Sequence, residues 1–213
     1  KAVIGVSGGL DSTLALLVIA KTFDMMGLDR KGIVAVTMPG FGTTGRTYNN
    51  ALELMKVLGT DVREISIKDA CLQHFSDIGH NPEVKDVVYE NSQARERTQI
   101  LMDLANKENA LVIGTGDMSE LALGWCTYNG DQMSMYGVNA GVPKTMVRMI
   151  VEYVAGCKEF ISAKPYLLDV VATPVSPELL PADSNGNINQ KTEDIVGPYE
   201  LHDFFLYHLL KNG

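Results

Sequence analysis

Cysteine is scarce in this sequence, basic residues are not in excess, and long hydrophobic runs are missing. The three cysteines, Cys71, Cys126 and Cys157, match neither a disulfide framework nor zinc-ligand spacing, so a reducing, cytoplasmic setting is expected. The net charge of −8 argues against general nucleic-acid binding, because there is no cationic excess to displace counterions. No apolar run is long enough to cross a bilayer, so no membrane partner is expected either.

What is present is the composition of one globular domain. The chain has 213 residues, of which 46% are apolar, and this supports a single core spanning residues 1–213. The chain opens on Lys1 and reaches a strand-like run at Ala2, without the pattern of a signal peptide. This opening suggests a piece of a longer protein, so further domains are expected beside it.

Short β-branched runs alternate with longer helical stretches. Strands are expected at Ala2–Val6, Ile33–Thr37, Val62–Ser66 and Ala110–Gly114, and helices at Asp11–Met26, Tyr48–Leu58 and Val84–Asn109. Three of the four strands are nearly all apolar, which is typical of parallel strands covered on both faces. The order therefore predicts an α/β fold: a doubly wound parallel sheet with helices on both faces, binding ligands beyond the carboxyl ends of its strands.

After about Ala163 the periodicity weakens. Residues 164–198 are rich in Pro, Asp, Asn and Gly, which favours a mobile loop over the substrate. The last segment, Tyr199–Lys211, has the pattern of a short amphipathic helix.

The turn after the first strand carries the strongest chemical signal. It reads Ser7-Gly8-Gly9-Leu10-Asp11-Ser12, and an apolar helix follows. Paired glycines let the backbone approach a ligand closely, and the amides at a helix start attract an anion. An aspartate in such a phosphate loop is repelled by the ligand unless a divalent cation joins the two, so Asp11 is a candidate Mg²⁺ ligand. The alternative is that Asp11 or Ser12 only caps the helix.

This loop resembles the S-G-G-x-D-S motif of the ATP pyrophosphatases. The resemblance implies their fold, which is adenine nucleotide alpha hydrolase-like (PP-loop), and a loop that binds the β,γ-pyrophosphate of ATP. The ATP-binding residues implied in this part of the chain are Gly5, Val6, Ser7, Gly8, Gly9, Leu10, Asp11 and Ser12.

Three downstream motifs resemble the NAD synthetase family, and in particular its bacterial glutamine-dependent branch. They are residues 114–125 (GTGDMSELALGW), residues 139–145 (NAGVPKT) and residues 91–97 (NSQARER). The resemblance implies a ligase that uses ATP and Mg²⁺ to adenylate the nicotinate carboxylate of deamido-NAD and then transfers the carbonyl to ammonia. The products are NAD, AMP and pyrophosphate. It also implies a glutaminase domain in the full-length chain and a homo-oligomer, at least a dimer.

The same resemblance assigns roles to single residues. Thr115 and Lys144 contact ATP, and Asp11 and Glu120 hold the metal. Asp11 and Lys144 stabilise the transition state, and no residue acts as a nucleophile. The residues implied to contact the dinucleotide substrate are Asn91, Arg95, Glu120, Trp125, Cys126, Thr127 and Tyr128.

The residues by themselves leave alternatives open. The spacing of Asp117 and Glu120 also fits a capping box, in which Glu120 reaches back to the helix start. Asn91 and Arg95 share one helix face, which either grips a substrate or is a solvated flank. A buried core is the default expectation for the single Trp125, and the resemblance raises the alternative of a pocket. Two rival functions also remain: another adenylating amidotransferase such as GMP synthetase, and a nucleotide-binding sensor without turnover.

Overall fold

The computed structural model describes residues 1–43, 45–176, 179–180 and 192–213. Within them, five strands form one sheet in the order β3-β2-β1-β4-β5, and every pairing is parallel. The strands are β1 (Ala2–Gly5), β2 (Ile33–Thr37), β3 (Asp61–Glu64), β4 (Leu111–Gly114) and β5 (Tyr136–Gly137). The four expected strands are present. The fifth, β5, was not predicted, because a strand of two residues is too short to show a periodic pattern.

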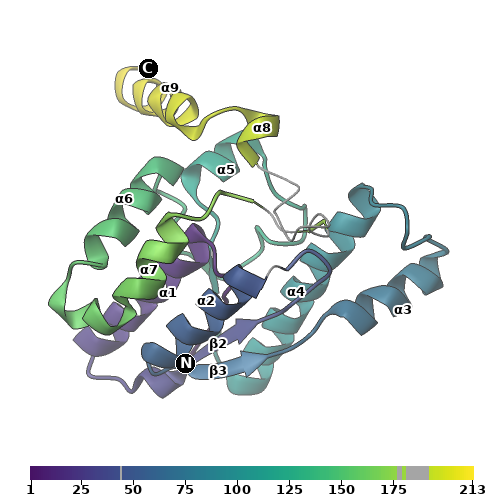
Figure 1. Cartoon of the computed structure of the whole chain (residues 1–213), viewed down its shortest axis with the longest axis horizontal. Helices are drawn as coiled ribbons and strands as arrows, with labels where there is room; N and C mark the ends of the chain where they lie inside the picture. The colour runs from purple at the N-terminus through teal and green to yellow at the C-terminus, as the bar shows by residue number, and fades with distance from the viewer. Residues whose placement is uncertain (44, 177–178, 181–191) are drawn as a thin grey trace.

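Helices cover both faces of the sheet, as expected (Figure 1). One face carries α1 (Leu10–Met25), α2 (Gly45–Val57), α6 (Lys144–Val154) and α7 (Lys164–Val171). The other carries α3 (Lys68–Ile78) and α4 (Val87–Glu108). Three further helices are α5 (Met118–Leu123), which lies between β4 and β5 in the chain, and α8 (Thr192–Val196) and α9 (Tyr199–Asn212), which follow α7. Short 3₁₀ turns span Arg30–Gly32 and Lys158–Ala163.

The central strands β1 and β2 are almost entirely apolar because both of their faces are buried. Along β1, Ile4 belongs to the core beneath α1, whereas Val3 belongs to the core beneath α4. Along β2, Ala35 and Val34 divide between the two cores in the same way. Side chains alternate along a strand, so a central strand needs apolar side chains on both of its faces.

The expectation of a loop over residues 164–198 is wrong at its start, where α7 lies, and near its end, where Thr192–Val196 form α8. Residues Lys164–Val171 form α7, with Pro165 in the first turn, where its missing N–H removes no helical hydrogen bond. Leu167 and Val170 of this helix are buried in the core shared with α1 and α6. Tertiary packing therefore supports a helix whose sequence is weakly periodic. Residues 177–178 and 181–191 of the expected loop lie outside the described residues.

The strand order positions the loops that matter for function. β1 lies at the centre of the sheet, between β2 and β4, so the chain leaves β1 and β4 at the same edge. The turns after Gly5 and Gly114 therefore lie side by side, at a point where parallel α/β sheets bind ligands. None of the helices in the described part of the chain is long and apolar enough to span a bilayer.

Candidate active site

The loop after β1 is held in shape by its own hydroxyl groups. Ser7 N donates to Ser12 Oγ at 3.2 Å, and Gly9 N donates to Ser7 Oγ at 3.2 Å. Gly9 is the N-cap of α1 and no side chain caps this helix start, so the alternative that Asp11 or Ser12 caps α1 is wrong. Asp11 is instead the second residue of the helix, and its side chain is available for other contacts.

Gly8 is required by the geometry of this loop. Its φ is +87°, and a Cβ at this position would lie 2.1 Å from the carbonyl oxygen of Thr47. Gly8→Ala is expected to lower the melting temperature by at least about 4 °C, since a positive φ alone costs roughly 1–2 kcal/mol and the contact with Thr47 adds to that. Circular dichroism would measure this. Gly9→Ala is the matched control for stability, because Gly9 has a φ of −91° and its Cβ would meet only Ser7 Oγ, at 3.4 Å. Equal losses in the two variants would contradict this account of Gly8.

A buried cluster of four charged side chains lies beside the loop. Lys144 Nζ is 2.5 Å from Asp11 Oδ2, 2.6 Å from Asp117 Oδ2 and 2.8 Å from Glu120 Oε1. Asp11 comes from α1, Asp117 and Glu120 from the start of α5, and Lys144 is the first residue of α6. Lys144 is only 3% exposed, so its ammonium group contacts carboxylates in place of water.

The environment of the cluster shifts the pKa of its members. Burial by itself lowers the pKa of Lys144, but the three carboxylates outweigh burial and raise this pKa above its usual range. Burial raises the pKa of Asp11 and of Glu120, and Lys144 only partly offsets that effect. Three carboxylates facing one ammonium leave a formal excess of two negative charges when all are ionised. The cluster is therefore short of positive charge by the amount that a divalent cation carries.

The donor set also fits a magnesium ion. One oxygen from each of Asp11, Asp117 and Glu120 lies within 4.8 Å of the others. Asp11 Oδ1 is buried and has no hydrogen-bond partner among the described residues. Carboxylate oxygens are the ligands that Mg²⁺ prefers. Asp11 and Glu120 could hold the ion as the sequence predicts, with Asp117 close enough to assist.

Two residues of this centre received no functional role from sequence reasoning. Asp117 was considered only as a helix cap; it does accept a hydrogen bond from Glu120 N at 2.8 Å, but its second oxygen faces Lys144. The side chain of Glu120 accepts from Lys144 Nζ, so only half of a capping box is formed. Asn139 Nδ2 donates to the backbone oxygens of Asp11, at 2.9 Å, and Thr115, at 3.0 Å. Asn139 lies in the motif at residues 139–145, and that position was the signal in the sequence that could have identified it as a site residue.

A cavity of about 550 Å³ opens over the loop and the carboxylates. Most of the predicted site residues line it: Gly5, Val6, Ser7, Gly9, Leu10, Asp11, Ser12, Asn91, Thr115, Glu120, Trp125, Cys126 and Thr127. Arg97, which sequence analysis assigned no role, also lines this cavity. Trp125 is half-buried at its wall, which favours the pocket over the core for this side chain.

Four predicted site residues are not part of the cavity lining: Gly8, Arg95, Tyr128 and Lys144. Lys144 lies behind the carboxylates, whereas Tyr128 is 73% exposed. Arg95 Nε donates to the backbone oxygen of Tyr128 at 3.1 Å, and Thr127 Oγ1 donates to Asn91 Oδ1 at 2.7 Å. The polar face of α4 thus contacts the segment of residues 125–128, and only Asn91 of the pair on α4 reaches the cavity.

Comparison with known proteins places this chain in a family. The family model described as NAD synthase matches residues 1–169. The chain belongs to the NAD synthase family. The glutamine-dependent NAD(+) synthetase of Mycobacterium leprae is 48% identical over 219 residues, which cover 100% of this chain and 32% of the relative. The glutamine-dependent NAD(+) synthetase of Acinetobacter baylyi is 34% identical, over 96% of this chain and 36% of the relative. This NAD synthase chain therefore spans about a third of the length of these relatives.

Solved structures agree on the fold. The NMN synthetase from Francisella tularensis has a TM-score of 0.77 and 27% identity, covering 96% of this chain and 76% of that one. The glutamine-dependent NAD+ synthetase from Acinetobacter baumannii, in complex with ADP, has a TM-score of 0.69 and 29% identity, covering 80% of this chain and 31% of that one.

Proposed function

We propose that this NAD synthase domain adenylates the nicotinate carboxylate of deamido-NAD with ATP and then transfers the carbonyl to ammonia, giving NAD, AMP and pyrophosphate. The observation that carries the proposal is the cluster of Asp11, Glu120 and Lys144, which lies beside a glycine loop at a cavity. Membership of the NAD synthase family and the glutamine-dependent NAD(+) synthetases among its relatives support the choice of reaction.

The first step makes a leaving group. The carboxylate cannot be aminated directly, because oxide is a very poor leaving group. Its oxygen therefore attacks the α-phosphorus of ATP, a new P–O bond forms, and pyrophosphate departs. The amides of the loop and the start of α1 bind the pyrophosphate, and Lys144 supplies a fixed positive charge beside it. Asp11 and Glu120 hold magnesium, which when bound supplies a Lewis acid that offsets charge on the phosphate oxygens.

The second step forms the amide. Ammonia attacks the adenylate carbonyl, a C–N bond forms, the nitrogen loses one proton to solvent, and AMP leaves with the electron pair of the broken C–O bond. The protein contributes positioning and exclusion of water, so no side-chain nucleophile is needed. Asn91, Trp125 and Thr127 line the part of the cavity assigned to the dinucleotide.

The proposal extends to the whole protein. A glutaminase domain in the full-length chain supplies the ammonia, in a homo-oligomer in the cytoplasm. Apolar side chains exposed along α6 support self-association: Met149 is 66% and Tyr153 75% exposed. Light scattering on the full-length protein tests this, and a monomer at micromolar concentration would contradict it.

The test of the reaction is pyrophosphate release from ATP and Mg²⁺ with ammonium chloride, comparing three acceptors. Deamido-NAD is expected to support release, and xanthosine monophosphate is not. Nicotinate mononucleotide is included because the relative from Francisella tularensis is named for the mononucleotide NMN. Release with xanthosine monophosphate alone would favour another amidotransferase. ATP binding without release for any acceptor would favour a nucleotide sensor.

A further inference from the structure

The C-terminal helix contributes one buried carboxylate to the region behind the active site. Asp203 of α9 is 8% exposed. Its Oδ1 accepts a hydrogen bond from the hydroxyl of Ser119. Its Oδ2 accepts from Thr145 N at 2.8 Å and from Thr145 Oγ1 at 2.7 Å. A single side chain therefore joins α9 to the first turns of α5 and α6.

Each of these contacts is one residue away from the charged cluster. Ser119 immediately precedes Glu120, and Thr145 immediately follows Lys144. Ser119 Oγ also accepts from Lys144 N at 2.9 Å, so the two helix starts are linked directly as well as through Asp203. Any shift of Asp203 would be transmitted to the backbone that carries the cluster.

The start of α6 depends on this network for its backbone hydrogen bonds. Pro143 is its N-cap and offers no side-chain acceptor, so the first N–H groups need partners from elsewhere. Ser119 accepts from the first of them and Asp203 from the second. A carboxylate is also favoured at a helix N-terminus by the helix dipole. Asp203 thus caps a helix to which it does not belong.

Helix α9 reaches the cluster at a second point. The ring of Tyr199, one turn before Asp203, has its centroid 5.4 Å from Lys144 Nζ. Tyr199 and Asp203 are the two buried residues of α9. Most of the rest of the helix is exposed, including Phe205 at 66%. The face by which α9 is anchored is therefore the face that contacts Lys144 and its neighbours.

We infer that Asp203 is a positioning residue for adenylation: it holds Glu120 and Lys144 in register with Asp11. The inference rests on the proposed function, because it assigns a task to that same site. A displacement of about 1 Å in catalytic groups can cost about 100-fold in rate, so loss of this tether is expected to affect kcat more than the binding of deamido-NAD.

The test uses the full-length protein with ammonium chloride as nitrogen donor. Asp203→Ala is expected to lower kcat by about 100-fold, with the KM for deamido-NAD changed by less than about threefold. Asp203→Asn retains a carbonyl acceptor for Thr145, so its kcat is expected to be at least about tenfold higher than that of Asp203→Ala. Glu200→Gln is the matched control. Glu200 is exposed on the same helix, and this variant should have the activity of the unsubstituted protein.

A second measurement does not depend on turnover. Calorimetric titration with ATP and Mg²⁺ is expected to give at least about tenfold weaker binding for Asp203→Ala than for Glu200→Gln. If Asp203→Ala does not fold, Ser119→Ala is the second variant: it removes the hydrogen bonds of Ser119 Oγ with Asp203 and with Lys144 N, leaves those between Asp203 and Thr145, and should lower kcat by about tenfold. An Asp203→Ala protein that melts earlier but keeps its kcat and ATP affinity would overturn the inference. If the unsubstituted protein makes no NAD, the proposed function fails, and the titration still decides the role of Asp203.

Discussion

Asp11→Asn is expected to reduce pyrophosphate release with deamido-NAD by about three orders of magnitude, the effect of losing about 4 kcal/mol of transition-state stabilisation. Asparagine keeps the size of the side chain but removes its charge. The buried Oδ1 of Asp11, which has no partner among the described residues, is the atom best placed to bind a cation. The measurement is a steady-state assay over a range of Mg²⁺ concentrations, in which the variant should need more Mg²⁺ for half-maximal rate.

Asp69→Asn is a closely matched control for this variant. Asp69 is the second residue of α3, as Asp11 is of α1, but it is exposed. A role confined to the helix dipole would cost each variant about 0.3–1 kcal/mol of stability and leave the rate unchanged. Asp11→Asn with the same rate and Mg²⁺ dependence as Asp69→Asn would therefore contradict a metal-binding role.

Lys144→Met is expected to lower both activity and stability. The side chain keeps its length but loses the cation that faces three carboxylates. Removing one partner of a buried ion pair typically costs 3–5 kcal/mol, which for this chain corresponds to a fall in melting temperature of about 10 °C in metal-free buffer at pH 7. The rate of pyrophosphate release should fall by at least about 100-fold, since a preorganised charge is lost.

The loss of stability should depend on pH in a known direction. Burial raises the pKa of Asp11 and of Glu120, so the folded protein binds protons that the unfolded chain releases. Stability of the variant should therefore rise as the pH falls from 7 towards about 4, and the gap to the unsubstituted protein should narrow. Mg²⁺ should also raise the melting temperature of the variant more than that of the unsubstituted protein, because it replaces the missing positive charge.

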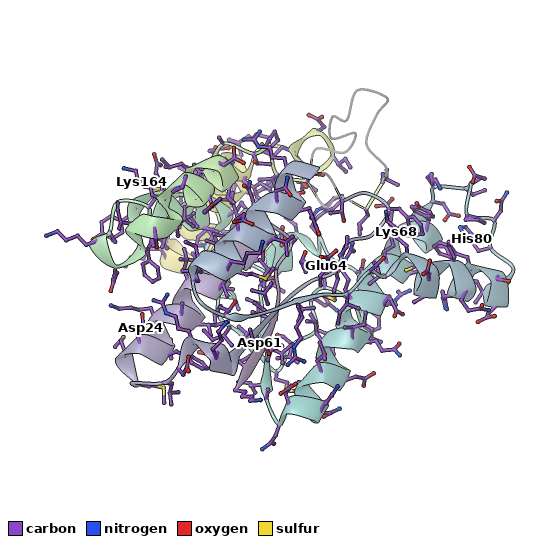
Figure 2. The ribbon with its side chains drawn as sticks, turned by 60° about the horizontal axis from the view of Figure 1, so that its bottom comes forward. Asp24, Asp61, Glu64, Lys68, His80 and Lys164 are labelled. Atoms are coloured by element: carbon purple, nitrogen blue, oxygen red, sulfur yellow. The ribbon has the colours of Figure 1, made fainter. Side chains whose placement is uncertain are left out.

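Lys68→Met provides the control. Lys68 is the first residue of α3, as Lys144 is of α6, and it is exposed. Figure 2 shows Lys68 at the start of α3. Lys164, the first residue of α7, lies on the opposite side of the molecule in that view. This variant should keep its activity and melting temperature at every pH. A Lys144→Met protein with the same stability as Lys68→Met would show that the carboxylates do not need the ammonium.

The sequence predicted the sheet better than the helices, and the reason is burial. The runs at Ala2–Val6 and Ile33–Thr37 hold no polar side chain other than Thr37, which leaves few alternatives to a central strand. Helices α3, α6, α7 and α8 were missed because short helices are stabilised mainly by what they pack against. Helix α4 begins at Val87 instead of the predicted Val84, and it buries Tyr89 and Gln93.

The sequence by itself determined the local features of the site: a glycine loop after a strand, a helix start beyond it, and the residue types of a family motif. Those features depend on neighbours within a few positions, so they can be recognised in a linear pattern. Only the tertiary structure decided which residues meet. Lys144 and Asp11 are 133 positions apart, and Ser119 and Asp203 are 84 apart. Such pairs form only because burial of both sheet faces sets the strand order and brings the starts of α1, α5 and α6 together.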